Sequence, residues 1–173
     1  SLSRIEMDEH VQPHDRVQLA PLLGHVAELL GPAAARRQMR IEVKCAPALP
    51  PVEGNPDQLQ QLFVNLIDNA IKYARAGTPI RVGAEAATLG DGRAAVRVSV
   101  ADQGEGIARE HIPRLTERFY RIDAGRSRQE GGTGLGLAIV KHVTSRHRGQ
   151  LKIESEIGVG SVFTVLLPAL SQN

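Results

Sequence analysis

Apolar residues follow a helical period between positions 55 and 73. Seven of them share one face at i, i+3, i+4 spacing: Leu59, Leu62, Phe63, Leu66, Ile67, Ala70 and Ile71. Asn55 suits the N-cap, Pro56 the first helical position, and Gln58 the capping-box position. The pattern therefore predicts an amphipathic helix over 56–73 with one buried face.

The same patterns predict further helices and strands. Helical spacing covers 21–34, where Gly31-Pro32 is expected to kink or interrupt the helix, and 137–148, with basic residues Lys141, Arg146, His147 and Arg148 toward its end and Gly149 as its stop. Alternating positions predict strands at 40–46, 80–86, 96–100, 151–155 and 161–167. We expect an α+β fold, a two-layer sandwich with a mixed, mostly antiparallel sheet of about five strands and about three helices on one face.

Composition narrows the class of protein. A chain of 173 residues with 42% hydrophobic and 23% charged residues is typical of one globular domain. No apolar run approaches the roughly 18 residues of a membrane span. The single cysteine, Cys45, excludes an internal disulfide, disfavours a cysteine-based zinc site and is expected to be a buried strand thiol. A net charge of +2 gives no sign of a nucleic-acid partner.

A polar stripe lies beside the apolar face of the predicted helix 56–73. Asn65, Asn69, Lys72 and Tyr73 fall at i, i+4, i+7 and i+8. Taken alone, this stripe is most simply the solvated flank of an amphipathic helix. Its meaning therefore depends on what the rest of the chain places against it.

Glycines and one aspartate supply that context. Four glycines within 131–136 precede a helix, where bare N–H groups and the helix dipole favour an anion. The run matches neither a P-loop nor the dinucleotide-binding fingerprint. Asp102 ends a predicted strand and precedes Gly104 and Gly106, although an aspartate there also suits an ordinary turn. The segment 108–131 lacks a period, apart from a helical turn near 112–115, and is typical of a lid or of disorder.

Motifs in a fixed order then identify a family resemblance. They read Asn65-x3-Asn69-Ala-x-Lys72-Tyr73, Asp102-x-Gly104-x-Gly106, Arg118-Phe119-Tyr120-Arg121, Gly132-Thr133-Gly134-Leu135-Gly136-Leu137 and Gly158-x-Gly160-Ser161-x-Phe163. Their order and spacing resemble the N, G1, F and G2 boxes of the ATP-binding catalytic domain of bacterial sensor histidine kinases, a Bergerat-type fold. The resemblance covers about residues 17–168, and 117–121 are most similar to phosphate-sensor and osmosensor kinases.

This resemblance implies ATP between helix 56–73 and the lid. Asp102 would accept a hydrogen bond from the adenine amine, Ser161 would support the base through water, and Tyr73 would pack near the base or ribose. Asn69 would bind Mg²⁺, with Asn65 as a second candidate ligand, and Phe119 would anchor the lid on an apolar surface. The other implied nucleotide contacts are Lys72, Gly104, Gly106, Ile107, Gly132, Thr133, Gly134, Leu135, Gly136 and Leu137.

The implied chemistry is phosphoryl transfer, with Asn65, Lys72, Arg118 and Arg121 as catalytic candidates. Gyrase-like and chaperone relatives of this fold carry Glu at the position of Asn65, as general base for water. An amide cannot take that proton, so transfer to a histidine is favoured over hydrolysis. A non-kinase ATPase of this superfamily, or a serine kinase or nucleotide-binding regulatory module, stays open as an alternative.

The six histidines all lack the motif context of the family's phosphoacceptor. We therefore expect that acceptor on an upstream dimerisation domain, with 1–16 as its stub and linker and 17–170 as the ATP-binding domain, whose lid is at about 108–131. The resemblance implies a homodimeric, membrane-anchored full-length protein that phosphorylates a response regulator. This domain would be cytoplasmic and would contact neither nucleic acid nor membrane.

Overall fold

The computed structural model describes residues 12–122 and 135–170. One layer is a five-stranded sheet in the order β2-β4-β5-β7-β6. Its strands are β2 (Ile41–Cys45), β4 (Ile80–Thr88), β5 (Ala94–Asp102), β6 (Gln150–Glu156) and β7 (Gly160–Pro168). The pair β2–β4 is parallel, and the other pairs are antiparallel. The predicted mixed, mostly antiparallel sheet is confirmed.

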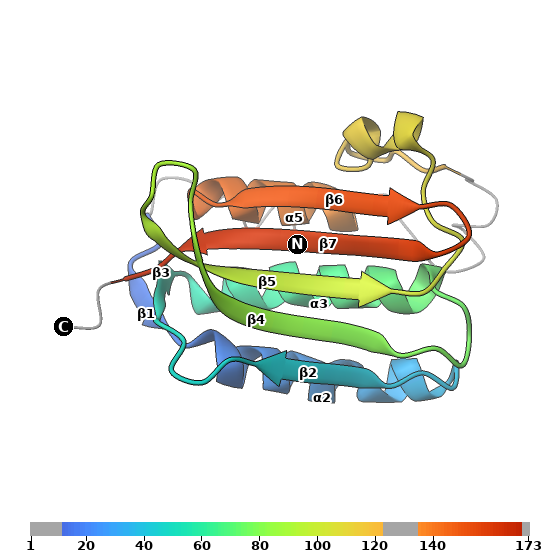
Figure 1. Ribbon diagram of the computed structural model, residues 1–173, viewed down its shortest axis with the longest axis horizontal. Helices are drawn as coiled ribbons and strands as arrows, with labels where there is room; N and C mark the ends of the chain where they lie inside the picture. The colour runs from blue at the N-terminus through green and yellow to red at the C-terminus, as the bar shows by residue number, and fades with distance from the viewer. Residues whose placement is uncertain (1–11, 123–134, 171–173) are drawn as a thin grey trace.

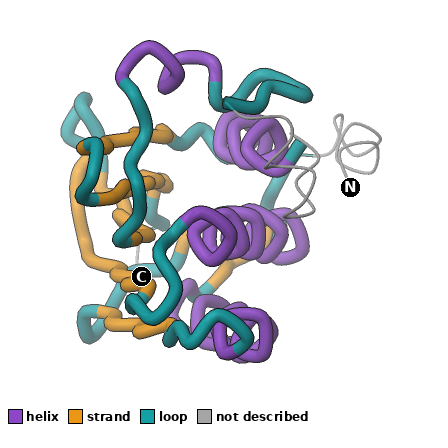
Figure 2. Tube along the Cα trace, turned by 90° about the vertical axis from the view of Figure 1, so that its right-hand side faces the viewer, coloured by secondary structure: helices purple, strands orange, loops and turns teal. Residues whose placement is uncertain are grey.

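The other layer consists of α2 (Leu19–Ala35), α3 (Pro56–Tyr73) and α5 (Gly136–Arg146). These helices cover one face of the sheet, as Figures 1 and 2 show from two directions. Helix α3 is the middle one, since it packs against both α2 and α5. A 3₁₀ helix, η1 (Arg109–Arg114), lies where the sequence predicted a helical turn. The α+β sandwich is therefore confirmed.

The core lies between these two layers. Helix α3 inserts its predicted apolar face there, and Phe63 is fully buried. Apolar residues on alternate positions of β4 and β5 meet it from the sheet, because side chains along a strand alternate between the two faces. At about 1.5–3 kcal/mol for each large apolar side chain removed from water, this face dominates the stabilisation of α3.

Several details differ from the expectations. Helix α2 runs through Pro32 and ends three residues later, so the expected interruption is wrong. A small antiparallel sheet of β1 (Asp15–Val17) and β3 (Val52–Gly54) was not predicted, because three-residue strands have too short a pattern. Cys45 is on a strand as expected but is only half-buried, since β2 is an edge strand.

The end of α5 also differs from the prediction. The residue in the left-handed conformation after the helix is Arg148, with φ +57°, and not Gly149. Glycine is needed at 149 for another reason, because a Cβ there would overlap the carbonyl oxygen of Leu166 in β7. Position 149 is therefore a close-packing site rather than the helix stop.

Candidate functional site

Helix α3 is fixed at its N-terminal end by two polar contacts. The Asn55 side chain accepts a hydrogen bond from the Gln58 N–H at 3.1 Å, so the predicted N-cap is confirmed. The Asn55 N–H donates to Nε2 of buried His147 at 3.0 Å. Nδ1 of His147 lies 2.8 Å from the carbonyl oxygen of Val143, which can only accept. His147 is therefore neutral with its proton on Nδ1, and burial lowers its pKa.

The C-terminal end of α3 is joined to the loop after β5. The Arg37 guanidinium donates to the carbonyl of Ile71 in the last turn of α3. The Arg75 N–H donates to the Gln103 carbonyl at 2.8 Å, and Ala74 forms a β-bridge with Gly104. A Cβ at Gly104 would lie 2.8 Å from the carbonyl oxygen of Tyr73. Motifs some 30 residues apart in the printed sequence are thus in direct backbone contact.

The loop after β5 also packs against the β6–β7 turn. Gly106 has φ +78°, and a Cβ on it would lie 2.7 Å from the carbonyl carbon of Glu156. The Gly158 N–H donates to the Glu105 carbonyl at 2.8 Å. Gly160 approaches Asp102 so closely that a Cβ would overlap the Asp102 carbonyl oxygen. Gly106 and Gly160 are thus required by close contacts between backbones, whereas a Cβ on Gly158 would meet nothing within 4 Å. The contact with Gly160 holds Asp102 in place.

Ser155 on β6 connects this loop to β7. Its Oγ accepts a hydrogen bond from the Ile107 N–H at 2.7 Å and donates to the Gly160 carbonyl at 3.1 Å. It also lies 2.8 Å from Oγ of Ser161, which is itself buried. Because a hydroxyl has one proton, Ser161 is the donor in that contact when Ser155 donates to Gly160. Ser161 then keeps only acceptor capacity.

Asp102 is a half-buried carboxylate at the end of a central strand. It pairs with Ser161 in the β5–β7 register. Burial raises its pKa to about 6, and the hydrogen bond from the Ser161 backbone opposes this rise. Asp102 therefore carries an ionisable acceptor that is only partly satisfied, which is typical of ligand-binding positions.

The polar stripe of α3 contains one side chain in an ion pair and one with an unpaired buried atom. Lys72 forms an ion pair with Asp68 at 3.0 Å, one turn earlier on the same helix. Nδ2 of Asn65 is enclosed without a hydrogen-bond partner among the described residues. Such an atom is costly unless a ligand or water satisfies it. Tyr73 at the end of the stripe is 36% exposed.

The described part of the lid carries an exposed aromatic ring. Phe119 is 70% exposed and has φ +65°, so the expectation that it anchors the lid on an apolar surface is wrong for this structure. A neighbouring cluster holds the segment instead, in which Tyr120 hydrogen-bonds His111 and lies 4.4 Å from the Arg114 guanidinium. Arg118 is exposed and Arg121 is half-buried on the same segment.

Helix α5 begins at Gly136, after the predicted glycine run. Its N-cap, Leu135, provides no side-chain hydrogen bond to the first turn. The binding of an anion by the first N–H groups of this helix stays a prediction. Leu137 packs against the core from the first turn. Gly132, Thr133 and Gly134 lie outside the described residues.

Four residues of the site were missed by the sequence reasoning. His147 had been grouped with the charged end of α5, whereas it is buried and neutral. Ser155 and Arg37 gave no sequence signal, because their partners are backbone atoms distant in the chain. Asp68 could have been found, since it lies four residues before Lys72 on a predicted helix.

Comparisons with known proteins agree with this geometry. The family model described as histidine kinase-, DNA gyrase B- and HSP90-like ATPase matches residues 54–171. The phosphate regulon sensor protein PhoR of Pseudomonas aeruginosa is 40% identical over 94% of this chain and 35% of its own length. The sensor-like histidine kinase SenX3 of Mycolicibacterium smegmatis is 36% identical over 96% of this chain and 42% of its own length. The chain thus spans about two-fifths or less of these curated relatives.

Solved structures give the same result. Full-length ShkA in complex with AMPPNP superposes with a TM-score of 0.81 at 30% identity, covering 98% of this chain and 34% of ShkA. The mycobacterial sensor histidine kinase MprB superposes with a TM-score of 0.69 at 28% identity, covering 90% of this chain and 97% of that chain. No helix in the described part is long and apolar enough to cross a membrane.

Proposed function

This chain belongs to the histidine kinase-, DNA gyrase B- and HSP90-like ATPase family, and from that premise we propose that it is the ATP-binding catalytic domain of a sensor histidine kinase. It binds Mg-ATP and transfers the γ-phosphoryl to a histidine on a separate dimerisation domain. The kinase relatives and the AMPPNP complex of ShkA support this choice. In the full-length protein the phosphoryl passes to an aspartate of a response regulator.

One observation supports the proposal most strongly. Backbone contacts bring the end of α3 and Asp102 together, and β7 places Ser161 beside Asp102. This joins the polar stripe of α3 to the half-buried carboxylate, as adenine and phosphates of one nucleotide require. Asp102 then accepts the hydrogen bond of the adenine amine, and Tyr73 lies at the adjoining end of α3.

The residues present fit Mg²⁺. The described part has no group of three His, Cys, Asp or Glu that could hold a metal ion. Mg²⁺ keeps several waters and takes oxygen ligands, so an amide oxygen together with phosphate oxygens suffices. Asn69 would be the ligand, and Asn65 the second candidate, on the same side of α3. When bound, Mg²⁺ neutralises charge that develops on the phosphates.

Cationic side chains surround the position of the phosphates in this proposal. Lys72 contributes a point charge, and the Asp68 carboxylate at 3.0 Å holds it on the stripe side of α3. The N-terminal N–H groups of α5 bind phosphate oxygens. Arg118 and Arg121 add charge from the lid. Transfer then rests on positioning and charge neutralisation rather than on covalent chemistry by the protein.

Asn65 decides between transfer and hydrolysis. Its amide lies on α3 where the related ATPases carry a general base, and it cannot accept a proton from water. The bound γ-phosphoryl is then kept for a stronger nucleophile, the imidazole of the dimerisation domain. That domain belongs to the same full-length protein, which we propose to be a membrane-anchored homodimer with this domain in the cytoplasm.

A labelling experiment tests the proposal. The chain is incubated with γ-labelled ATP and Mg²⁺, alone and with the dimerisation domain of its full-length protein. We expect saturable nucleotide binding, no acid-labile label on the chain itself, and label on the added domain. Steady ATP hydrolysis that is lost in Asn65→Ala, without transfer, would instead identify a non-kinase ATPase.

A further inference from the structure

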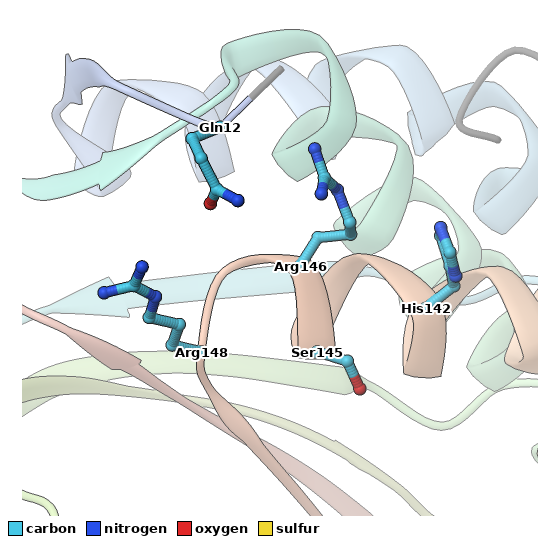
Figure 3. Close-up of a pocket in the computed structure, with 5 residues that line it drawn as sticks. All are labelled: Gln12, His142, Ser145, Arg146 and Arg148. Carbon is cyan, nitrogen blue, oxygen red and sulfur yellow. The ribbon is translucent and has the colours of Figure 1, made fainter. Parts of the chain in front are cut away.

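A cavity lies at the C-terminal end of α5. It has a volume of about 270 Å³ and is lined by Gln12, His142, Ser145, Arg146 and Arg148. Figure 3 shows Gln12 reaching from the N-terminal segment toward the end of α5, with Arg146 and Arg148 on either side of it in that view. Three of the five lining side chains are basic, the other two are neutral hydrogen-bonding groups, and none is acidic.

This cavity is separate from the proposed nucleotide site. The N–H groups that would bind phosphate are at Gly136, and the cavity is at the opposite end of the same helix, at Arg146. Ten residues of α-helix span about 15 Å. A ligand in the cavity therefore does not share contacts with the phosphates of ATP.

The helix dipole alone does not explain the lining. Cations near a helix C-terminus are generally favoured, which accounts for a basic residue in the last turn. It does not account for His142, whose Nε2 is enclosed without a hydrogen-bond partner among the described residues. His142, Ser145 and Arg146 lie at i, i+3 and i+4 and thus share one helix face. The unused hydrogen-bonding capacity on that face is Nε2 of His142, which has no partner among the described residues.

Arg148 is the second unusual feature of the cavity. Its φ is +57°, a conformation in which glycine is favoured and an arginine is strained. The chain places Gly149 one residue later, where the contact with β7 demands it. A strained backbone conformation at the rim of a cavity is a reason to look for a function. Here the strained residue supplies one of the two guanidinium groups.

We propose that this cavity is a binding site for an oxyanion of the phosphate or carboxylate class. Guanidinium groups match the planar and tetrahedral oxygens of such anions, and the Gln12 amide adds a donor (Figure 3). The site needs neither ATP nor the proposed kinase activity. A test of anion binding in this cavity can therefore succeed or fail independently of a test of the proposed kinase function.

An NMR titration tests the site. The chain is titrated with inorganic phosphate and, separately, with acetate, each against chloride at the same ionic strength. We expect saturable shifts of the amides from 142 to 149, with a dissociation constant on the order of 1 mM for a single anion. Tighter binding of phosphate assigns the site to phosphoryl groups, and tighter binding of acetate assigns it to carboxylates. Absence of saturable shifts with both would overturn the proposal.

Two variants make the test specific. Arg148→Gly removes a guanidinium and suits the left-handed backbone, so the melting temperature should stay near that of the parent chain while anion affinity falls at least about fivefold. Lys152→Gln removes the same charge from an exposed position on β6 outside the cavity. It should leave anion affinity unchanged. Equal losses in both variants would indicate non-specific charge attraction and contradict the site.

Discussion

At the scale of single residues, Asp102 combines a cost to the ligand-free protein with a gain on binding. Its carboxylate is half-buried, and burial raises its pKa to about 6. A pKa raised above its ordinary value means that ionisation is disfavoured in the folded protein. The protonated Asp102 side chain is therefore favoured in the folded protein over the unfolded chain. Its contribution to the free energy of unfolding is complete below about pH 3.8 and is lost as pH rises through about 6.

Asp102→Asn should separate binding from folding. A hydrogen bond to a charged group contributes about 1.5–3 kcal/mol, so ATP affinity should fall roughly ten- to hundredfold. The melting temperature of the ligand-free variant at pH 7 should match or exceed that of the parent chain, because the cost of the buried charge is gone. Calorimetric titration and thermal unfolding measure the two quantities. Unchanged ATP affinity would contradict the assignment of Asp102 to the base.

The same residue predicts a pH dependence of binding. Protonation of Asp102 below about pH 6 removes the charged acceptor, so ATP affinity should decline as pH falls through that value. In Asp102→Asn this decline should be absent. Fluorescence titration with a nucleotide analogue between pH 5 and 8 provides the comparison. An identical pH profile in both chains would assign the titration to another group.

Gly106 offers a residue-scale test of the backbone contacts. Gly106→Ala has to accommodate both φ +78° and a Cβ 2.7 Å from the Glu156 carbonyl carbon. Gly158→Ala is a matched control, because its φ is +81° but its Cβ would meet nothing within 4 Å. Positive φ alone costs about 1–2 kcal/mol, so the control should lose about that much and Gly106→Ala clearly more. Urea unfolding measures both, and equal losses would show that the loop simply moves aside.

At the scale of elements, α3 is the part that the sequence predicts best. Its cap, its proline and its apolar period all agree, and each acts within the helix itself. What the sequence leaves open depends on contacts across the chain. The parallel pairing of β2 with β4 and the bridge from Ala74 to Gly104 join segments whose local patterns do not specify a partner.

The candidate site follows the same division. Motifs predicted the residue types of the polar stripe and of Asp102 and Ser161. Their order and spacing resemble those of a family of ATP-binding domains, and amides, charged groups and glycines are the groups that can contact a nucleotide. The roles of Gly104 and Gly106 in packing were not predicted, since a sequence does not show which backbone lies against them. Phe119 was predicted to lie on an apolar surface but is exposed. The prediction failed because the local sequence around an aromatic residue in a lid does not show which surface the ring contacts.

His147 links two elements and makes their contact depend on pH. Its Nε2 accepts the Asn55 N–H at the start of α3, and burial lowers its pKa, with the nearby Arg146 charge acting in the same direction. A lowered pKa means that the unfolded chain takes the proton first. The stability from His147 is therefore present above about pH 6.5 and is lost as pH falls through the folded pKa.

Replacing His147 should reveal this link. His147→Leu leaves the Asn55 N–H unpaired, so we expect a loss of about 1–3 kcal/mol in the free energy of unfolding at pH 7.5. The difference between variant and parent should shrink as pH falls below about 6.5. Denaturant unfolding at several pH values measures it, with exposed His25→Gln on α2 as control. A difference independent of pH would mean that His147 contributes packing only.

At the scale of the whole molecule, ligand binding should appear as added stability of the entire two-layer domain. A ligand that binds only the folded state stabilises it by about 2.7 kcal/mol at one hundred times its dissociation constant. Helix α3 packs against both neighbouring helices, so contacts made on its stripe act on the shared core. Nucleotide binding is therefore expected to raise the melting temperature of the domain, which should still unfold in a single transition.

Metal removal gives the matching prediction. ATP with Mg²⁺ should raise the melting temperature more than ATP with EDTA, because in the proposed site Asn69 would be a ligand of the metal. In Asn69→Ala the two conditions should give similar and smaller shifts. The control is Gln60→Ala, which truncates a half-buried side chain on the opposite side of the same helix and should keep the metal effect. Differential scanning fluorimetry measures the shifts. An unaltered metal effect in Asn69→Ala would move the ligand role to Asn65.

The buried carboxylate at the end of β5 also has a consequence for choice among nucleotides. In the proposed site adenine would present its amine donor to Asp102, whereas guanine would present a carbonyl acceptor at the corresponding position. Two acceptors facing each other in a partly dry site leave both unpaired, and sites of this kind reject the wrong partner strongly. Signalling by such a domain would draw on the adenylate pool of the cell and ignore changes in guanylate supply.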